Sequence, residues 1–267
     1  MLRDITLGQY YQAESPIHKL DPRVKLFATF AYIIMLFVCG NAYTYAFSAI
    51  CLLMLILMSK IPFGFIFRGI KSILVILFIS VFFHIFFTPG KILFEFYFIK
   101  ITYEGLIRAL FMGIRFMLII LASSLLTLTT TPNNLTDGLD KSLGFLKIIK
   151  IPVHEIAMMM SIALRFIPIL IEETDKIIKA QTARGADFES GKLLERAKAM
   201  IPVLIPLFIS AFKRADDLAA AMDARCYRGG EGRTKMKPLK YKGADFAGYF
   251  FVAIYAIIMI VIEMVVS

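Results

Sequence analysis

The sequence predicts an all-α integral membrane protein with about five transmembrane helices and a cytoplasmic domain of long amphipathic helices inserted before the last of them. Of its 267 residues, 59% are hydrophobic, and the mean hydropathy is +0.75. Soluble domains contain only about 45–50% apolar residues. The chain also has five long apolar runs, and 32 of its 50 charged residues lie between positions 132 and 243. Such a division is typical of a bilayer protein that carries one water-facing insert.

Each of the five apolar runs is close to the roughly 20 residues that a helix needs to cross a hydrocarbon core. The runs are 24–39, 43–58, 70–88, 106–130 and 246–266. Residues 1–131 are therefore expected to hold transmembrane helices one to four, 132–243 the cytoplasmic helices, and 244–267 the last transmembrane helix. The polar stretch 1–23 lacks the apolar core and cleavage site of a signal peptide, so we expect it to be retained.

The orientation follows from the positions of Lys and Arg in the short connections. Basic residues precede the first span and lie between the second and third spans, whereas the turn around Asn41 between the first and second spans has none. This asymmetry predicts a multi-pass protein of the cell membrane with its N-terminus and the 132–243 region in the cytoplasm and its C-terminus outside. The basic residues are Arg3, Lys19, Arg23, Lys25, Lys60, Arg68 and Lys71.

The insert is predicted to consist of a short amphipathic helix within 131–153 and then two long helices. The first long helix starts after Pro152 and stops near Gly185, because glycine accepts the left-handed conformation that closes a helix. The second runs from Lys192 to about Arg225. The paired prolines Pro202 and Pro206 are expected to bend or interrupt it. The apolar runs 155–171 and 199–212 are short and belong to longer amphipathic helices, so they are not assigned as spans.

One pattern, Ala-x-x-Ala-Arg, occurs at both predicted helix ends. The first copy is Ala180 to Arg184 and the second is Ala221 to Arg225, 41 residues further on. A small residue beside arginine lets a helix end approach another protein closely, and the planar guanidinium forms bidentate bonds to a carboxylate. A single copy is most simply a chance feature of an alanine-rich helix. Two copies at matched ends favour a docking function.

Catalytic and metal sites are not indicated. The segment nearest to a phosphate-binding loop, 185–193, has the wrong spacing and lacks the hydroxyl residue that holds Mg²⁺. The three histidines, His18, His84 and His154, lie in unrelated segments, and three cysteines form no metal or disulfide pattern. We therefore expect no cofactor, no bound metal and no enzymatic activity.

Two arginines fall inside the fourth apolar run, where a charge is costly and usually faces a partner or an interface. Arg108 is close enough to the end of the span to extend its side chain to the interface. Arg115 lies deeper, and we consider both a partner-facing position and a purely structural one.

Several blocks resemble the T component of energy-coupling factor transporters, in order and spacing, from end to end. The string SPIHKLDPRVK, from Ser15 to Lys25, looks like the N-terminal signature of that family. Four further regions resemble its coupling-domain blocks, namely 163–168, 180–189, 201–208 and 214–230. Agreement among separate blocks is much more specific than any one motif.

The resemblance implies a non-catalytic subunit that joins two cytoplasmic ABC ATPase subunits to a substrate-binding membrane S component. It implies uptake of a vitamin or a metal ion, with specificity residing in the S component. It also implies that the two Ala-Arg motifs dock into the ATPases. The residues that match are Ala183, Arg184, Gly185, Ala224, Arg225 and Cys226. Cys226 departs from the usual Gly or Ser, but it is also small, so we expect docking to be retained.

Two other classes were considered. A self-sufficient secondary transporter needs inverted repeats and paired intramembrane charges, and the five runs show no matching halves. A nucleic-acid scaffold needs clustered basic residues, whereas those of 132–243 alternate with acids. The energy-coupling subunit is therefore the preferred hypothesis, and no nucleic-acid partner is expected.

Overall fold

The structure is a computed structural model that describes residues 10–96, 99–188, 193–229, 236 and 238–266. The described chain separates into two compact units. We call Gly8–Gly138 together with Leu239–Ser267 the bundle unit, and Leu139–Pro238 the insert unit. The division lies close to the predicted boundaries at 132 and 243, although the location of either unit relative to a membrane stays a prediction.

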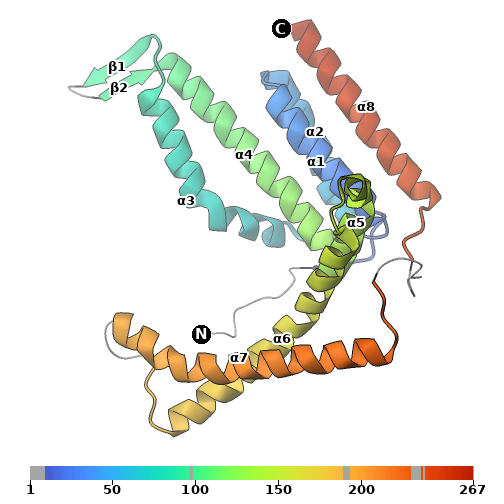
Figure 1. Cartoon of the computed structure of the whole chain (residues 1–267). Coiled ribbons are helices and arrows are strands. Elements are labelled where there is room, and N and C mark those ends of the chain that lie inside the picture. The colour runs from blue at the N-terminus through green and yellow to red at the C-terminus, as the bar shows by residue number, and fades with distance from the viewer. Residues whose placement is uncertain (1–9, 97–98, 189–192, 230–235, 237, 267) are drawn as a thin grey trace. The chain divides into compact units, whose positions relative to one another are not determined.

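Among the described residues, the bundle unit consists mainly of five helices, which are drawn in Figure 1 together with the start of α5. Helix α1 packs against both α4 and α8, α2 packs against the same two helices, and α3 packs along α4. The helices are α1 (Pro22–Val38), α2 (Ala42–Ser59), α3 (Phe63–Phe87), α4 (Tyr103–Thr129) and α8 (Gly243–Val266).

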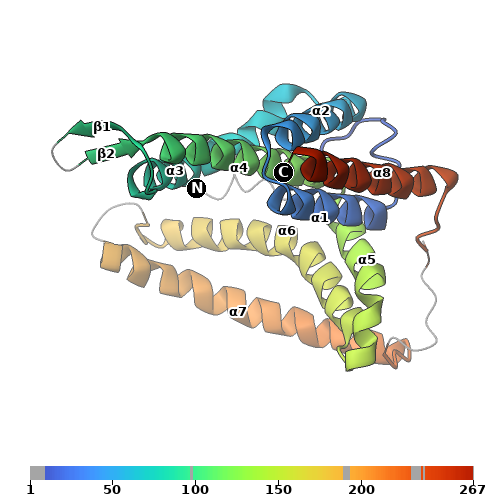
Figure 2. The ribbon, with the colours of Figure 1, turned by 90° about the horizontal axis from the view of Figure 1, so that it is seen from above.

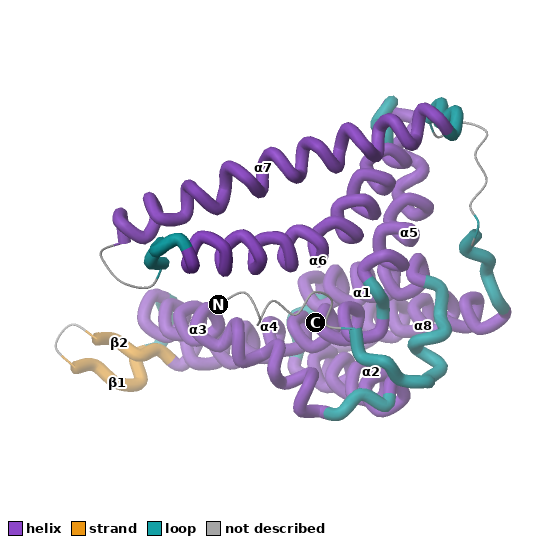
Figure 3. Tube along the Cα trace, turned by 90° about the horizontal axis from the view of Figure 1, so that it is seen from below, coloured by secondary structure: helices purple, strands orange, loops and turns teal. Residues whose placement is uncertain are grey.

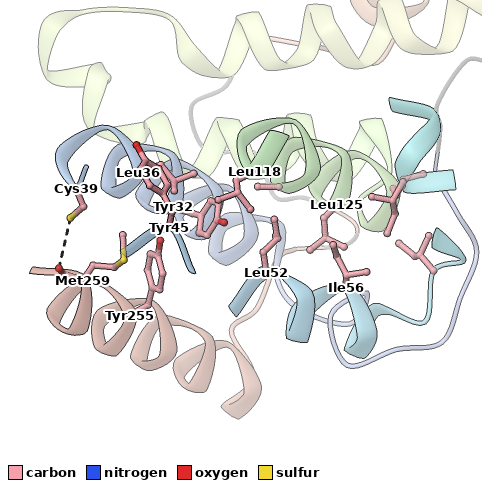
Figure 4. Packing of buried hydrophobic residues seen from close by; sticks show 14 residues of the cluster. Tyr32, Leu36, Cys39, Tyr45, Leu52, Ile56, Leu118, Leu125, Tyr255 and Met259 are labelled. Carbon is pink, nitrogen blue, oxygen red and sulfur yellow. Dashed lines mark hydrogen bonds between the residues drawn. The ribbon is translucent and has the colours of Figure 1, made fainter. Parts of the chain in front are cut away.

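The core of the bundle unit lies where α1, α2, α4 and α8 meet (Figure 4). Leu36 and Met259 are fully buried there. The rings of Tyr32 and Tyr255 stack with their centroids 5.5 Å apart, and the hydroxyl of Tyr255 hydrogen-bonds to Ser48 at 2.9 Å. Residues far apart in the sequence thus form one core, which fixes α8 against the N-terminal helices.

Most large apolar side chains on the outer surface of these helices are exposed, as expected where lipid replaces water. Among the described residues, four helices are long and apolar enough to cross a bilayer: α2, α4, α8 and α6 (Val153–Ala183). The first three coincide with predicted spans. Helix α1 has 17 residues and the described apolar stretch of α3 is Leu74–Phe87, so both are shorter. An all-α membrane protein is confirmed.

Helix α6 contains the apolar run 155–171, which the sequence does not predict to be a span. By length and composition it qualifies, with a mean hydropathy of 1.6 over its most apolar window. Its assignment to the cytoplasmic side therefore depends on its charged second half and on the charge asymmetry of the chain, and it stays a prediction.

A short antiparallel hairpin, which the sequence analysis did not predict, joins α3 to α4. Strands β1 (Ile92–Phe96) and β2 (Ile99–Thr102) pair in the register Glu95 opposite Lys100. Their β-branched and aromatic residues favour extended backbone. Figure 3 shows the hairpin beyond the ends of the two helices that it connects. It is a small addition to a helical fold.

The insert unit consists mainly of two long helices, α6 (Val153–Ala183) and α7 (Leu193–Ala224), which pack against each other. Before them come α5 (Pro132–Ser142), whose first residues belong to the bundle unit, and the 3-10 helix η2 (Leu143–Ile149). Figure 2 shows α6 and α7 side by side, running in opposite directions. The predicted short helix and both long helices are confirmed, while Lys192 lies outside the described residues.

Prolines do not interrupt either long helix. Pro168 lies inside α6, and Pro202 and Pro206 lie inside α7, which continues for 32 residues. The prediction allowed a bend or a break in the second helix, and a break is excluded. Packing of α7 along α6 supplies the stabilisation that a helix needs to tolerate lost backbone hydrogen bonds.

Candidate docking motifs at the ends of two helices

The two Ala-Arg motifs form the C-terminal ends of the two long helices. Helix α6 ends at Ala183 and α7 at Ala224, so Arg184 and Arg225 each follow the last helical residue. Because the helices run in opposite directions, these ends lie at opposite ends of the pair (Figure 1). The structure therefore separates the motifs in space rather than bringing them together.

The end of α6 is a Schellman motif, in which two backbone N–H groups bond back to the last turn. The N–H of Ala186 donates to the carbonyl of Gln181 at 3.0 Å, and that of Gly185 donates to Thr182 at 3.0 Å. The N–H of Arg184 also donates to Gln181. The carbonyls of Ala180, Gln181 and Thr182 are thereby paired with backbone N–H groups, without any contribution from a side chain.

The end of α7 repeats this pattern, position for position, 41 residues later. The N–H of Tyr227 donates to the carbonyl of Met222 at 3.1 Å, and that of Cys226 donates to Asp223 at 2.9 Å. The N–H of Arg225 donates to Met222. The sequence repeat thus encodes a repeated backbone shape.

This shape explains the residue after each arginine. Gly185 has φ of +89° and Cys226 has φ of +54°, both in the left-handed region. Glycine reaches that region without steric cost, whereas other L-residues pay roughly 1–2 kcal/mol. Cys226 therefore fits the motif but carries backbone strain that Gly185 does not.

The motifs are open to partners. Ala183, Arg184, Ala224, Arg225 and Cys226 are all exposed. Within the described ranges, the guanidinium groups of Arg184 and Arg225 make no hydrogen bond or ion pair. Each end of the helix pair thus exposes an arginine that has no partner among the described residues, next to an alanine whose side chain is a single methyl group.

A polar contact between α6 and α7 joins the two motif-bearing helices. The guanidinium of Arg214 donates to Glu173 Oε2 at 2.8 Å, and the hydroxyl of Ser210 donates to the other carboxylate oxygen. An open groove of about 280 Å³ lies beside this contact. Apolar side chains line most of it, among them Phe166, Leu170 and Leu218.

The two intramembrane arginines differ in their surroundings. Arg108 is exposed near the start of α4. Arg115 donates from Nε to the hydroxyl of Tyr45 at 2.8 Å, and its guanidinium lies 5.3 Å from the ring centroid of Phe37. Contacts with neutral groups of the bundle hold Arg115 in place, and whether it also faces a partner stays open.

The three histidines are in separate places, and the described part of the chain holds no cluster of metal-ligating side chains. His18 contacts Ser15 and Tyr11, His84 contacts the carbonyl of Ser80, and His154 lies 3.6 Å from Asp140. Each has a local structural partner.

A network around the first turn of α1 has no counterpart in the sequence predictions. It includes Asp21 and Lys25 of the N-terminal string and Asp245 at the start of α8. From the sequence, the string Ser15 to Lys25 is only a family signature, with no predicted contacts. The sequence does contain a signal for this network: a lysine and two aspartates lie at the ends of apolar runs. Charged residues are rarely buried unless they are paired or hydrogen-bonded, so charges at such positions indicate mutual contacts.

The apolar helices of spanning length, their shared core and the two exposed helix ends define a multi-pass membrane protein that carries a repeated arginine motif. Comparison with known families agrees with this class. The model of the cobalt transport protein family, CbiQ, matches residues 13–236.

Relatives described as energy-coupling factor transporter transmembrane proteins match over nearly the full length. The protein from Clostridium kluyveri is 52% identical over 248 residues, which is 92% of each chain. That from Bacillus subtilis is 48% identical over 246 residues, or 92% of this chain and 93% of the relative. That from Brevibacillus brevis is 46% identical over 263 residues, or 98% of each. The chain belongs to this family and is the energy-coupling transmembrane subunit of such a transporter.

Proposed function

We propose that this chain transmits motion from two cytoplasmic ATPase subunits to a separate membrane subunit that captures a vitamin or a metal ion, and that it performs no catalysis itself. The observation that carries the proposal is the pair of exposed arginines on Schellman motifs with matching hydrogen bonds, at opposite ends of one helix pair. Two equivalent docking ends suit two equivalent partners.

The chemistry of each end favours an acidic groove on the partner. The guanidinium offers a planar set of donors that matches a carboxylate, and Arg184 and Arg225 have no competing acceptor among the described residues. Ala183 and Ala224 add little bulk, so a groove wall can approach the backbone. The Schellman bonds already pair the carbonyls of Gln181 and Thr182 in α6 and their counterparts in α7, so these backbone groups need no partner in the groove.

Glu173 of α6 accepts hydrogen bonds from Ser210 and Arg214 of α7. These bonds link the two helices at a point between the two motif-bearing ends. A relative movement of the two ATPases would therefore act on α6 and α7 as a linked pair. The insert is continuous in sequence with α4 on one side and α8 on the other. The movement would reach the transmembrane helices through those two connections.

The test is co-expression with the ATPases and the capture subunit, followed by purification in detergent and reconstitution. Arg184→Glu or Arg225→Glu is expected to reduce ATPase co-purification and ATP-dependent uptake, and the double variant to abolish both. An unpaired carboxylate left buried in each groove costs roughly 3–5 kcal/mol. Substrate capture by the membrane subunit should survive.

Lys213→Glu is the matched control, because Lys213 is an exposed basic residue on α7 away from the motifs. It should leave co-purification and uptake at the wild-type level. A double glutamate variant that retains both activities would refute the docking role.

A further inference from the structure

A set of hydrogen bonds in the bundle unit joins the chain segments on either side of the insert. It comprises Asp21, the N-cap residue of α1, Lys25 in the first turn of α1, Asp245 in the first turn of α8, and the end of α4 at Thr129 and Thr130. We call it the junction. The chain leaves for the insert just after Thr130 and returns just before α8.

On the return side, the carboxylate of Asp245 serves two helices. Its Oδ1 accepts the backbone N–H of Asp21 at 2.7 Å, and its Oδ2 accepts that of Lys242 at 2.6 Å. Lys242 immediately precedes α8, and Asp21 is the N-cap residue of α1. One side chain, only 1% exposed, thus caps α8 and holds the start of α1.

On the exit side, the ammonium group of Lys25 binds the end of α4. Its Nζ donates to the carbonyl of Thr129 at 2.9 Å, to Thr130 Oγ1 at 3.3 Å and to the carbonyl of His18 at 3.3 Å. The last carbonyls of a helix lack intrahelical partners and carry partial negative charge. Lys25 is 7% exposed, so its ammonium group interacts with these acceptors instead of with solvent.

Arg23 strengthens the link between the two sides. It donates from Nε and Nη2 to the two carboxylate oxygens of Asp21, at 3.0 and 2.9 Å. Its guanidinium also lies 3.8 Å from the ring centroid of Tyr241, which precedes α8. Burial works to raise the pKa of Asp21, but the hydrogen bonds from Arg23 outweigh it and leave that pKa below its ordinary value. Asp21 is therefore a carboxylate at neutral pH.

We propose that the junction is a coupling clamp, in which Lys25 and Asp245 act as positioning residues that hold the exit and return segments of the insert at a fixed separation. This inference rests on the proposed function, since it assigns to these residues the delivery of the insert's motion to the bundle. If the two segments were free to part, movement of α6 and α7 would be absorbed locally instead of displacing α1, α4 and α8 together.

The test uses the complete complex with its ATPases and capture subunit in proteoliposomes, with Lys25→Met and Asp245→Asn as variants. We expect assembly and ATP hydrolysis to persist while uptake per ATP hydrolysed falls about tenfold, in the range of ordinary coupling free energies. Lys19→Met and Glu14→Gln are the controls, because both side chains are exposed in the same N-terminal segment. They should leave the ratio unchanged.

A spin-label pair at Thr131 and Lys240 provides a second readout. The distance between the labels should stay constant through the ATP cycle in the wild type and widen or broaden in the variants. Arg23→Gln removes the bonds to Asp21 but leaves Asp245 and Lys25 in place, so it should give a smaller loss of coupling in a folded protein. If Lys25→Met and Asp245→Asn do not fold, Arg23→Gln alone tests whether the junction couples the insert to the bundle.

Two results would overturn the clamp. The first is that uptake and ATP hydrolysis fall in parallel in Lys25→Met and Asp245→Asn. The second is that Arg23→Gln leaves both the uptake per ATP hydrolysed and the label distance unchanged. The proposed docking function would survive that result, because it is tested by the loss of ATPase co-purification in Arg184→Glu and Arg225→Glu. Failure of the wild type to bind ATPases would instead refute both.

Discussion

Asp245 accepts a hydrogen bond from the backbone of Asp21, although the two residues are 224 positions apart in the chain. Both are aspartates, but their carboxylates have different partners: Asp245 accepts from an N–H group, while Asp21 directs its own carboxylate to Arg23. The contact joins the N-terminal ends of α1 and α8, where helix dipoles favour negative charge. It connects the start of the chain to the segment that follows the insert.

The two helix caps give a prediction about residues 185 and 226. Gly185→Ala should destabilise the end of α6 by about 1 kcal/mol, because alanine at φ of +89° is strained. Cys226→Gly should stabilise the end of α7 by a similar amount. Amide hydrogen exchange at Ala186 and Tyr227 would measure both effects. Unchanged protection in either variant would contradict the strain assigned to these positions.

Lysine substitutions separate charge from geometry at the docking motifs. Arg184→Lys or Arg225→Lys should weaken ATPase binding by about 1.5 kcal/mol each, since one of two charge-assisted bonds is lost. The melting temperature of the free subunit should not change, because both side chains are exposed and unpaired among the described residues. Affinity measured on immobilised subunit would test this. Wild-type affinity for both lysine variants would mean that only charge matters.

His18 gives a prediction about pH. Its pKa lies below the ordinary value because burial disfavours the charged ring and Lys25 repels it, although the bond to the Tyr11 carbonyl acts in the opposite direction. The unfolded chain therefore takes up a proton first as the pH falls. The contribution of His18 to stability is complete above about pH 6.5 and is lost as the pH drops through its folded pKa.

Thermal unfolding in detergent at about pH 7.5 and about pH 5.5 should show this loss in the wild type. His18→Gln should reduce the difference between the two conditions, while His154→Gln, a histidine in the insert unit, should retain the His18 component. An equal pH effect in wild type and His18→Gln would contradict the assignment.

Gly248 is predicted to set the spacing of α1 and α8. A Cβ atom at this position would lie 2.8 Å from Val24 Cγ1, which is too close. Gly248→Ala should therefore push the helices apart and cost about 1–3 kcal/mol. Gly243→Ala is the control on the same helix, because nothing lies within 4 Å of its added Cβ. Equal melting temperatures for the two variants would argue against close packing here.

Topology is tested by single cysteines in intact cells after the native cysteines are replaced. Tyr43→Cys should react with an impermeant reagent, since the start of α2 is predicted to face outward, whereas Lys240→Cys should not. Thr182→Cys addresses α6, which is long and apolar enough to span. Its protection would agree with a cytoplasmic helix end, and its labelling would place α6 across the membrane and overturn the docking proposal.

The helices themselves were largely predictable from local information. Apolar runs located α1, α2, α4 and α8 to within three residues, whereas α3 begins at Phe63, well before its predicted run 70–88. Pro152 and Gly185 correctly marked the limits of α6. These features depend on hydrophobic length and on backbone preferences, which act between near neighbours. The β1–β2 hairpin was missed because its apolar residues resemble the adjoining spans.

The class of protein and the two Ala-Arg motifs can be read from the sequence alone, because a repeat of five residues and a resemblance in several blocks are visible in one dimension. The three-dimensional structure was needed to find that Gly185 and Cys226 share a left-handed backbone, and that Asp245 and Lys25 bind segments on both sides of the insert. Charge and helical periodicity do not reveal which distant N–H or carbonyl group a buried side chain will satisfy. That choice is made when the helices pack and each buried polar group must find a partner.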